Sequence, residues 1–260
     1  MPNLSETIPY VSYLSTKEKL YAENFASEHN LKIITPRNLR ISEDHKLVIW
    51  VTKNYISFQD LNIKNSKPFK LNYSDFKKIT SKSSLLKKCF STKDEGKKVV
   101  DLTAGYCLDA LEIGFIGFSV TAIEKKSWLY EFSKQNLKNI SVNNLSDAAK
   151  NLKLLNGDSL KLINNFNDFE IAYIDQMFEL KSEAKAKKEI QFLRNLEAKE
   201  IPLKDFIQPC KNNNIKKIII KTAINSNLKS LTGLKPSRVI KGKAFKSVSY
   251  THLRAHETFG

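Results

Sequence analysis

Residues 99–105 read VVDLTAG, and residues 171–178 read IAYIDQMF. Each stretch is a short apolar run that ends in a carboxylate and then a turn, which is the pattern of a buried parallel strand. In an open α/β sheet, ligands bind outside the carboxyl ends of the strands, where the strand order reverses. One strand end carries small residues and the other an aromatic residue, so we expect a cofactor pocket beside a pocket for a flat substrate.

The alternation of strands and helices from Lys97 onward predicts an α/β fold with a parallel sheet and crossover helices. Two further strands are expected within residues 238–250. The other expected strands cover residues 98–102, 118–123, 152–156, 170–175 and 215–221, and the expected helices cover 107–115, 126–139, 182–197 and 203–212.

Residues 1–90 are expected to form a small α+β unit. A strand at 8–14 precedes Ser15, which matches a helix N-cap because Glu18 follows three residues later, and this helix should reach about His29. The β-rich runs then cover 31–35, 46–53 and 55–60, and the Lys- and Ser-rich residues 66–86 predict a linker with a short helix.

The end of the chain has a different character. Residues 248–258 read VSYTHLRAHET, which resembles the translation of a transposase adaptor used in preparing sequencing libraries. We therefore expect residues 248–260 to be non-native, and His252 and His256 receive no role. The evolved domain would then cover residues 91–247, and the last strand should be incomplete or mispaired.

Composition limits the class of protein. A hydrophobic share of 41% over 260 residues is that of a globular protein. The net charge of +16 favours a nucleic-acid partner, although AT-rich codon usage also produces a Lys-rich chain. Without an apolar run of membrane length or a signal sequence, the protein is expected to be cytoplasmic, with no membrane partner. The scattered Cys and His residues predict reduced thiols and no metal site.

Acidic residues at the strand ends are candidates for cofactor binding. Glu124 ends the second strand of the α/β region, where a carboxylate can accept both ribose hydroxyls, or it is an exposed strand-end acid. Asp109 in a first helical turn can receive an amino group or serve the helix dipole. Asp158 can accept an adenine amine while Ser159 caps the next helix, although capping alone would explain both.

Residues 175–178 favour a substrate pocket for a nucleobase. An exocyclic base amine is a poor nucleophile. Its hydrogens can be accepted by a strand-end carboxylate such as Asp175 and by the neighbouring main-chain carbonyl of Gln176. Phe178 can stack on an extruded base, although it can also be a core aromatic residue. The arrangement is typical of an enzyme that transfers a methyl group from S-adenosylmethionine (SAM) to a base.

At these residues the chain resembles the ribosomal RNA small subunit methyltransferase J family. Residues 100–110 read VDLTAGYCLDA where the family carries LDATAGLGRDA, and residues 123–125 correspond to its Ile-Glu-Arg. Residues 157–159 match its Gly-Asp-Ser, and residues 175–178 correspond to its Asp-Pro-Met-Phe. Further matches follow at 187–190, 218–221 and 242–243, so the resemblance extends over roughly 97–247.

The resemblance implies a Rossmann-like class I methyltransferase sheet and an enzyme that methylates N2 of a guanine in 16S rRNA with SAM. The small ribosomal subunit is the alternative form of that partner, and we expect a monomer. The predicted catalytic residues are Asp175, Gln176 and Phe178. The predicted cofactor-binding residues are Asp101, Thr103, Gly105, Leu108, Asp109, Glu124, Lys125, Asp158, Ser159 and Asp175.

Three differences from the family pattern leave other functions open. Gln176 replaces a Pro, Cys107 and Leu108 replace Gly and Arg, and a Gly-rich basic stretch is represented only by residues 77–82. The alternatives are a non-catalytic RNA-binding relative and a methyltransferase for another base amine in RNA or DNA. A nicotinamide-dependent oxidoreductase is disfavoured because the Gly-x-Gly-x-x-Gly phosphate-binding pattern is absent.

Overall fold

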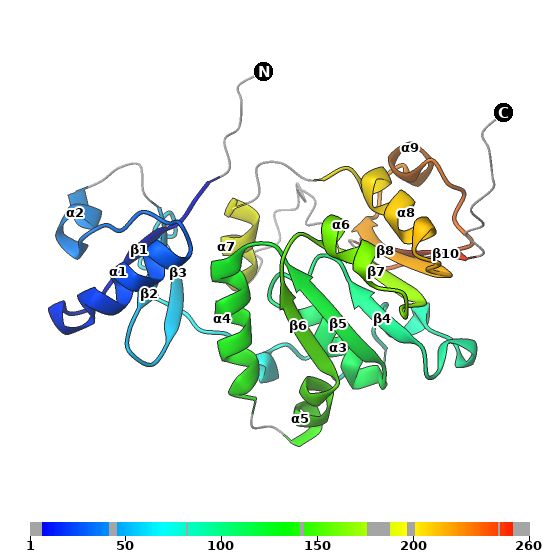
Figure 1. Ribbon diagram of the computed structural model, residues 1–260, viewed down its shortest axis with the longest axis horizontal. Helices are drawn as coiled ribbons and strands as arrows, with labels where there is room; N and C mark the ends of the chain where they lie inside the picture. The colour runs from blue at the N-terminus through cyan, green and yellow to red at the C-terminus, as the bar shows by residue number, and fades with distance from the viewer. Residues whose placement is uncertain are drawn as a thin grey trace. The chain divides into compact units, whose positions relative to one another are not determined.

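The computed structural model describes residues 7–41, 46–81, 83–140, 143–175, 188–196, 201–243 and 245–251 (Figure 1). The chain divides into two compact units. The N-terminal unit consists of Met1–Leu71 and Lys181–Glu200, and the sheet unit consists of Asn72–Leu180 and Ile201–Gly260. The boundary therefore lies at Leu71 and not near residue 90, where the sequence predicted it.

The N-terminal unit contains a three-stranded sheet in the order β1-β2-β3. β1 (Tyr10–Ser12) runs parallel to β2 (Leu47–Val51), and β3 (Ile56–Asp60) is antiparallel to β2. The predicted capping box at Ser15 and Glu18 is confirmed, and a 3-10 turn (Thr16–Glu18) leads into α1 (Lys19–Glu28). The expected strand at 31–35 is wrong: only Ile33 bridges to β1, and α2 (Pro36–Ile41) follows.

Helix α7 (Lys188–Leu196) also belongs to the N-terminal unit, although it follows the sheet strand at 171–175 in the chain. The Phe192 ring stacks on Phe58 of β3 with 4.7 Å between centroids. Asn195 Nδ2 donates a hydrogen bond of 2.7 Å to the carboxylate of Asp60. This helix confirms the described part of the helix predicted over 182–197, but its packing partner lies outside the predicted domain.

The sheet unit is built on seven strands in the order β6-β5-β4-β7-β8-β10-β9. The chain builds the sheet outward from β4 through β5 to β6 and then returns to place β7 on the other side of β4, so the order reverses between β4 and β7. Five strands are parallel: β4 (Lys98–Asp101), β5 (Ser119–Glu124), β6 (Leu152–Asn156), β7 (Ile171–Asp175) and β8 (Lys217–Ala223). Antiparallel β10 (Phe245–Thr251) lies between β8 and β9 (Arg238–Lys241).

Both faces of this sheet are buried, because alternate residues of each strand point to opposite sides. Ala172 and Ile174 of β7 pack in one cluster, and Ile171 and Tyr173 pack in the other. The first face is covered by α6 (Ser159–Leu162), α8 (Leu203–Asn212) and α9 (Leu228–Thr232), and the second by α3 (Leu108–Ile116) (Figure 1). Two further helices are α4 (Ser127–Lys138) and α5 (Asn143–Lys150). None of the helices in the described part of the chain is long and apolar enough to cross a membrane.

Residues 72–90 are anchored to the sheet unit and do not form the predicted linker. The Tyr73 hydroxyl donates to the main-chain oxygen of Tyr106 at 2.9 Å, and Ile79 is buried. Lys217 Nζ at the start of β8 donates to the main-chain oxygen of Cys89 at 2.6 Å and to Asp94 at 2.7 Å. These few buried contacts hold a segment whose Lys and Ser content is otherwise that of a linker. The segment contains 3-10 turns at Tyr73–Asp75 and Lys87–Cys89, and a third at Thr92–Asp94 follows it.

The last described strand is complete, so the expectation of an incomplete or mispaired strand is wrong. β10 pairs with β8 along its whole length, from Phe245 opposite Ala223 to Thr251 opposite Lys217. Tyr250 is 1% exposed, and its hydroxyl lies 3.2 Å from that of Thr232. The sequence at 248–251 has the alternation that a strand with a buried face needs, whatever its origin. The remaining residues of the expected tail lie outside the described part of the chain.

Truncating Tyr250 should therefore destabilise the sheet unit. We expect Tyr250→Ala to lower the free energy of unfolding by about 3–5 kcal/mol, because the change leaves a cavity in the core. Tyr250→Phe keeps the ring and should cost only about 1 kcal/mol for the lost hydroxyl contact. Guanidinium unfolding measures both values, and equal stability of Tyr250→Ala and wild type would show that β10 is not part of the folded sheet.

Candidate active site

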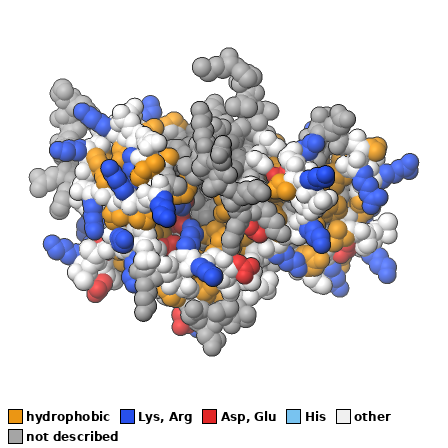
Figure 2. All heavy atoms as spheres, turned by 180° about the vertical axis from the view of Figure 1, so that it is seen from behind, with side chains coloured by type: hydrophobic (Ala, Val, Ile, Leu, Met, Phe, Trp, Pro, Cys, Tyr) orange, Lys and Arg blue, Asp and Glu red, His pale blue; other side chains and the backbone are white. Residues whose placement is uncertain are grey.

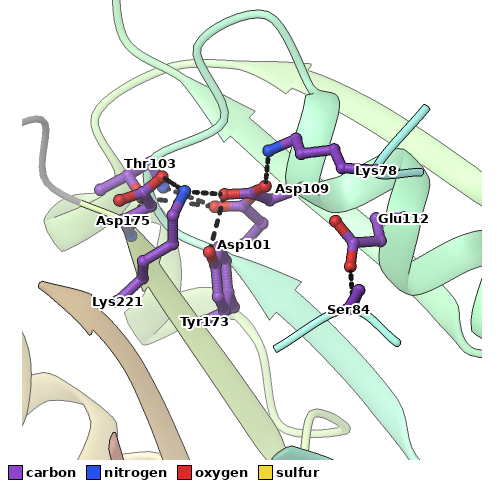
Figure 3. Close-up of polar contacts among 9 residues, drawn as sticks. All are labelled: Lys78, Ser84, Asp101, Thr103, Asp109, Glu112, Tyr173, Asp175 and Lys221. Carbon is purple, nitrogen blue, oxygen red and sulfur yellow. Dashed lines mark hydrogen bonds and ion pairs between the residues drawn. The ribbon is translucent and has the colours of Figure 1, made fainter. Parts of the chain in front are cut away.

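Polar residues gather at the carboxyl ends of the parallel strands, on the face covered by α3. Asp175 of β7 is in register with Lys221 of β8, and Asp101 of β4 is in register with Tyr173. Tyr173 and Asp175 are two residues apart, so their side chains point to the same face. That face also carries Asp109, in the first turn of α3. The strand pairing and the helix start bring these groups together (Figure 3).

Asp109 lies at the centre of this cluster. Its Oδ2 atom lies 2.8 Å from Lys221 Nζ and accepts a hydrogen bond of 2.7 Å from the Tyr173 hydroxyl. Its Oδ1 atom lies 2.5 Å from Nζ of Lys78, which comes from the segment before β4. Lys221 Nζ also contacts Asp175 Oδ2, so one ammonium group joins the two carboxylates (Figure 3).

The two carboxylates differ in acidity. Burial would raise the pKa of Asp109, but the positive charges of Lys221 and Lys78 outweigh it and hold this pKa well below the ordinary value. Burial raises the pKa of Asp175 to about 7; repulsion from Asp109 adds to this rise and Lys221 opposes it. Burial disfavours the charged form of Lys221, yet the two carboxylates raise its pKa well above the usual lysine value. Near neutral pH, Asp175 can therefore exchange a proton.

The turn after β4 is tied to the end of β7. Asp101 is 1% exposed, and its Oδ1 atom accepts hydrogen bonds from the Thr103 main-chain nitrogen at 2.9 Å and the Thr103 hydroxyl at 3.4 Å. The same hydroxyl accepts a 2.7 Å hydrogen bond from the main-chain nitrogen of Asp175. Burial raises the pKa of Asp101 to about 8, and the nearby charges of Asp109 and Asp175 add to this rise. These contacts use Asp101 and Thr103 to shape the turn, and their cofactor-binding roles stay predictions.

Glu124 lies at the carboxyl end of β5, as predicted. Its Oε2 atom accepts a 2.8 Å hydrogen bond from the main-chain nitrogen of Gly105, and its Oε1 atom accepts one of 2.8 Å from that of Lys126. Gly105 has a φ of 50°, in the left-handed region that favours glycine, so the turn can bring its nitrogen to the carboxylate. Both oxygens of Glu124 thus face main-chain donors at the ends of β4 and β5.

Asp158, not Ser159, caps the helix that follows β6. The Asp158 backbone is extended and its Oδ1 atom accepts a 3.0 Å hydrogen bond from the Leu160 main-chain nitrogen, whereas Ser159 is already the first residue of α6. The predicted capping role of Ser159 is therefore wrong. Asp158 Oδ2 lies 3.0 Å from Lys125 Nζ. Burial opposes ionisation, but hydrogen bonds from Lys125 and the Leu160 nitrogen lower the pKa of Asp158 below its usual value.

The start of α3 carries an unusual cap. Leu108 is its buried first residue, and Cys107 before it has a left-handed backbone with φ 59°. Such a conformation costs a non-glycine residue about 1–2 kcal/mol, which gives a physical reason for a glycine at this position in the family pattern. One turn further on, Glu112 is buried and accepts a hydrogen bond from the Ser84 hydroxyl (Figure 3).

The structure brings together some predicted residues and adds others. Asp101, Thr103, Asp109 and Asp175 meet between β4 and β7, whereas Glu124, Lys125 and Asp158 lie along the ends of β5 and β6. Gln176 and Phe178 lie outside the described residues. The residues that sequence reasoning did not assign to the site are Lys78, Tyr173 and Lys221. The position of Lys221 could have been predicted, because a strand that lies parallel to β7 must place one of its residues beside Asp175. No group of three or more His, Cys, Asp or Glu side chains in the described ranges is arranged to hold a metal ion.

Comparison with known proteins gives concordant results. Residues 32–250 match the family model described as "Putative SAM-dependent methyltransferase". The ribosomal RNA small subunit methyltransferase J of Francisella tularensis subsp. novicida is 28% identical over 209 residues, which cover 73% of this chain and 83% of that protein. The protein of the same name from Colwellia psychrerythraea is 24% identical over 147 residues, or 56% of this chain and 53% of that protein. A crystal structure of a SAM-dependent methyltransferase from Neisseria gonorrhoeae superposes with a TM-score of 0.65 at 14% identity, covering 93% of this chain and 95% of that one, which confirms the expected fold.

Glu112 predicts a specific pH dependence of stability. Burial, with the nearby charge of Asp109, raises its folded-state pKa to about 7, above the ordinary value of 4.5. Between these two pKa values, the folded state therefore binds more protons than the unfolded state. The stabilisation from the protonated Glu112 is fully present below about pH 4.5 and is lost as the pH rises through about 7. We expect Glu112→Gln, which cannot ionise, to gain stability relative to wild type across this window, by at most about 1.4 kcal/mol per pH unit.

Chemical unfolding at pH 5, 6, 7 and 8 measures this difference. Glu95→Gln is the control, because Glu95 is exposed and its substitution should leave the pH dependence unchanged. A constant difference between Glu112→Gln and wild type at all four pH values would contradict the assignment of a protonated, buried Glu112.

Proposed function

The chain belongs to the family of SAM-dependent methyltransferases, and from this membership we propose that it methylates the exocyclic N2 amine of a guanine in 16S rRNA. The relatives named ribosomal RNA small subunit methyltransferase J support the RNA substrate. The observation that carries the proposal is Asp175, a carboxylate with a pKa near 7 at the end of β7, beside the point where the strand order reverses. An enzyme acting on 16S rRNA works with ribosomes, so the proposal includes a cytoplasmic location.

The donors of SAM fit the acceptors at the strand ends. The two ribose hydroxyls of the cofactor are hydrogen-bond donors, and Glu124 offers a buried carboxylate at the end of β5, whose oxygens act only as acceptors. The adenine amine is also a donor, and Asp158 offers a carboxylate at the next strand end. The α-ammonium group of the cofactor matches the ionised Asp109. We assign these three residues to the adenosine and amino-acid parts of SAM.

Asp175 is proposed to act on the base amine. When bound, SAM supplies an activated methyl group, which the amine nitrogen takes with its lone pair while the carbon–sulfur bonding electrons stay on sulfur as a neutral thioether. The Asp175 carboxylate accepts hydrogen bonds from the amine and then the one proton that the amine must lose. A carboxylate with a pKa near 7 is suited to this task at neutral pH. The main-chain carbonyl of Gln176 and the ring of Phe178 complete the proposed base pocket.

The charge of the chain supports an RNA substrate. Figure 2 shows Lys and Arg side chains over much of one face, with fewer acidic side chains among them. We assign phosphate binding to the N-terminal unit, including α7, because this unit is rich in exposed basic residues. In the segment 17–40 these are Lys17, Lys19, Lys32, Arg37 and Arg40. Such binding should weaken steeply as salt increases.

Cofactor binding tests the role of Glu124. We expect Glu124→Gln to raise the Kd for SAM by about ten- to a hundredfold, because hydrogen bonds to a charged group contribute about 1.5–3 kcal/mol. Glu131→Gln is the control, since this residue lies on the surface of α4, where it pairs with Lys134. Isothermal titration calorimetry measures both, and an unchanged Kd for Glu124→Gln would remove Glu124 from the cofactor site.

Methyl transfer tests the function itself. With labelled SAM and 16S rRNA from a strain that lacks the methyltransferase J modification, we expect label on a guanine N2, identified by mass spectrometry of the nucleosides. Asp175→Asn should lower the rate by about a hundredfold or more, whereas Asp147→Asn, at an exposed surface pair, should not change it. SAM binding without transfer to rRNA would favour a non-catalytic RNA-binding protein, and label on another base would correct the target.

A further inference from the structure

Lys221 is a residue of the cluster to which neither the sequence analysis nor the proposed function gives a role. It lies on β8, directly in register with Asp175 on the neighbouring strand β7. Its Nζ atom contacts Asp175 Oδ2 and lies 2.8 Å from Asp109 Oδ2, so it joins β7 and β8 to the first turn of α3. A charged lysine in such a position is costly unless it is paired, and here it is paired twice.

We propose that Lys221 is a positioning residue for methyl transfer. Its ammonium group bridges Asp109 and Asp175 and holds the Asp175 carboxylate at the end of β7, where the substrate amine binds. The inference rests on the proposed function for the identity of the amine. The bridge between the two carboxylates stands on the contacts alone and can be tested without any substrate.

The charges around Asp175 explain why a cation is needed. The groups that face it in the described part of the chain come from each packed element: Asp101 from β4, Asp109 from α3, Tyr173 from β7, Lys221 from β8, and Lys78 through Asp109. Asp109 is an acidic side chain that contacts the same ammonium, and its charge favours the protonated form of Asp175, as burial does. Lys221 is the cation in contact with Asp175, so its ammonium keeps that side chain available as an acceptor near neutral pH.

The Asp109 contact gives the bridge a second consequence. Asp109 is the group that we assign to the cofactor ammonium, whereas Asp175 is assigned to the base amine. Lys221 touches both, so the spacing between the two reactant sites depends on a side chain that meets neither reaction partner directly. Methyl transfer requires in-line placement of the two reactants, and small displacements lower the rate strongly. Lys221 therefore acts on the rate through Asp175 and through the geometry of the pair.

Removing the ammonium should move the ionisation of Asp175 to higher pH. In Lys221→Gln we expect the acid limb of the kcat/KM profile to move upward in pH. The rate below pH 7 should then fall by about tenfold for each pH unit that the limb moves, and it should recover partly at high pH. Lys221→Arg keeps the positive charge and should retain a profile close to that of the wild type. Lys216→Gln is the matched control, because Lys216 is exposed just before β8.

The test that needs no substrate is a 13C NMR titration of the aspartate carboxyl groups in the unliganded full-length protein, with Asp175→Asn to assign the signal. We expect a higher midpoint for Asp175 in Lys221→Gln, and a return toward the wild-type midpoint in Lys221→Gln/Asp109→Asn, which removes the repelling carboxylate as well. If the single variant does not fold, the double variant is compared with Asp109→Asn alone, and loss of the ammonium should again raise the Asp175 midpoint. This titration tests the effect of Lys221 on the ionisation of Asp175 even if the wild type does not methylate rRNA.

Two results would overturn the inference. One is an Asp175 midpoint that is the same in Lys221→Gln as in the wild type, or the same in the double variant as in Asp109→Asn alone. The other is a loss of rate that is equal at all pH values and is shared by Lys221→Arg, since this would indicate a purely structural role for the lysine. A wild-type protein with no transferase activity but a higher midpoint in Lys221→Gln would contradict the proposed function and leave the charge bridge supported.

Discussion

The partly buried ammonium group of Lys221 makes the arrangement at the switch point of the sheet possible. The ends of β4 and β7 and the start of α3 bring three carboxylic acids close together, at Asp101, Asp109 and Asp175. Without a cation, burial and mutual repulsion would force these groups toward their protonated forms. Lys221 and, on the outer side, Lys78 keep Asp109 ionised, whereas the pKa of Asp175 is raised to about 7 and that of Asp101 to about 8. One acid in the site thus ionises easily while another titrates near neutrality, as a site that binds an ammonium group and accepts a proton requires.

The N-terminal unit includes a stretch of chain, Lys181–Glu200, that lies between two parts of the sheet unit. After Asp175 at the end of β7, the next described element is α7, which packs on Phe58 of the N-terminal sheet. It then returns to the sheet unit at Ile201. The unit to which we assign phosphate binding is therefore connected to the strand end to which we assign the base amine.

Parts of this architecture could be predicted from the sequence because they have strong local signals. The buried strands β4 and β7 are continuous apolar runs with a polar end, and α8 has its predicted bounds, 203–212. The helices α5, α6 and α9 are short and depend on packing for stability, so no periodicity predicted them. The domain boundary was placed too late because three buried residues, Tyr73, Ile79 and Cys89, anchor a segment of linker-like composition. Lys221 was seen only as the end of a strand, since its role depends on register with β7, which is a property of the sheet and not of any one segment.

The most direct test of this account is a crystal structure of the protein with S-adenosylhomocysteine bound. The account predicts that the ribose hydroxyls of the ligand donate to the Glu124 carboxylate, that the ligand ammonium meets Asp109, and that Lys221 still bridges Asp109 and Asp175. A ligand whose ribose lies away from Glu124 would contradict the assignment of the cofactor pocket. A Lys221 side chain that leaves Asp175 to bind the carboxylate of the ligand would contradict the central role given to the charge bridge.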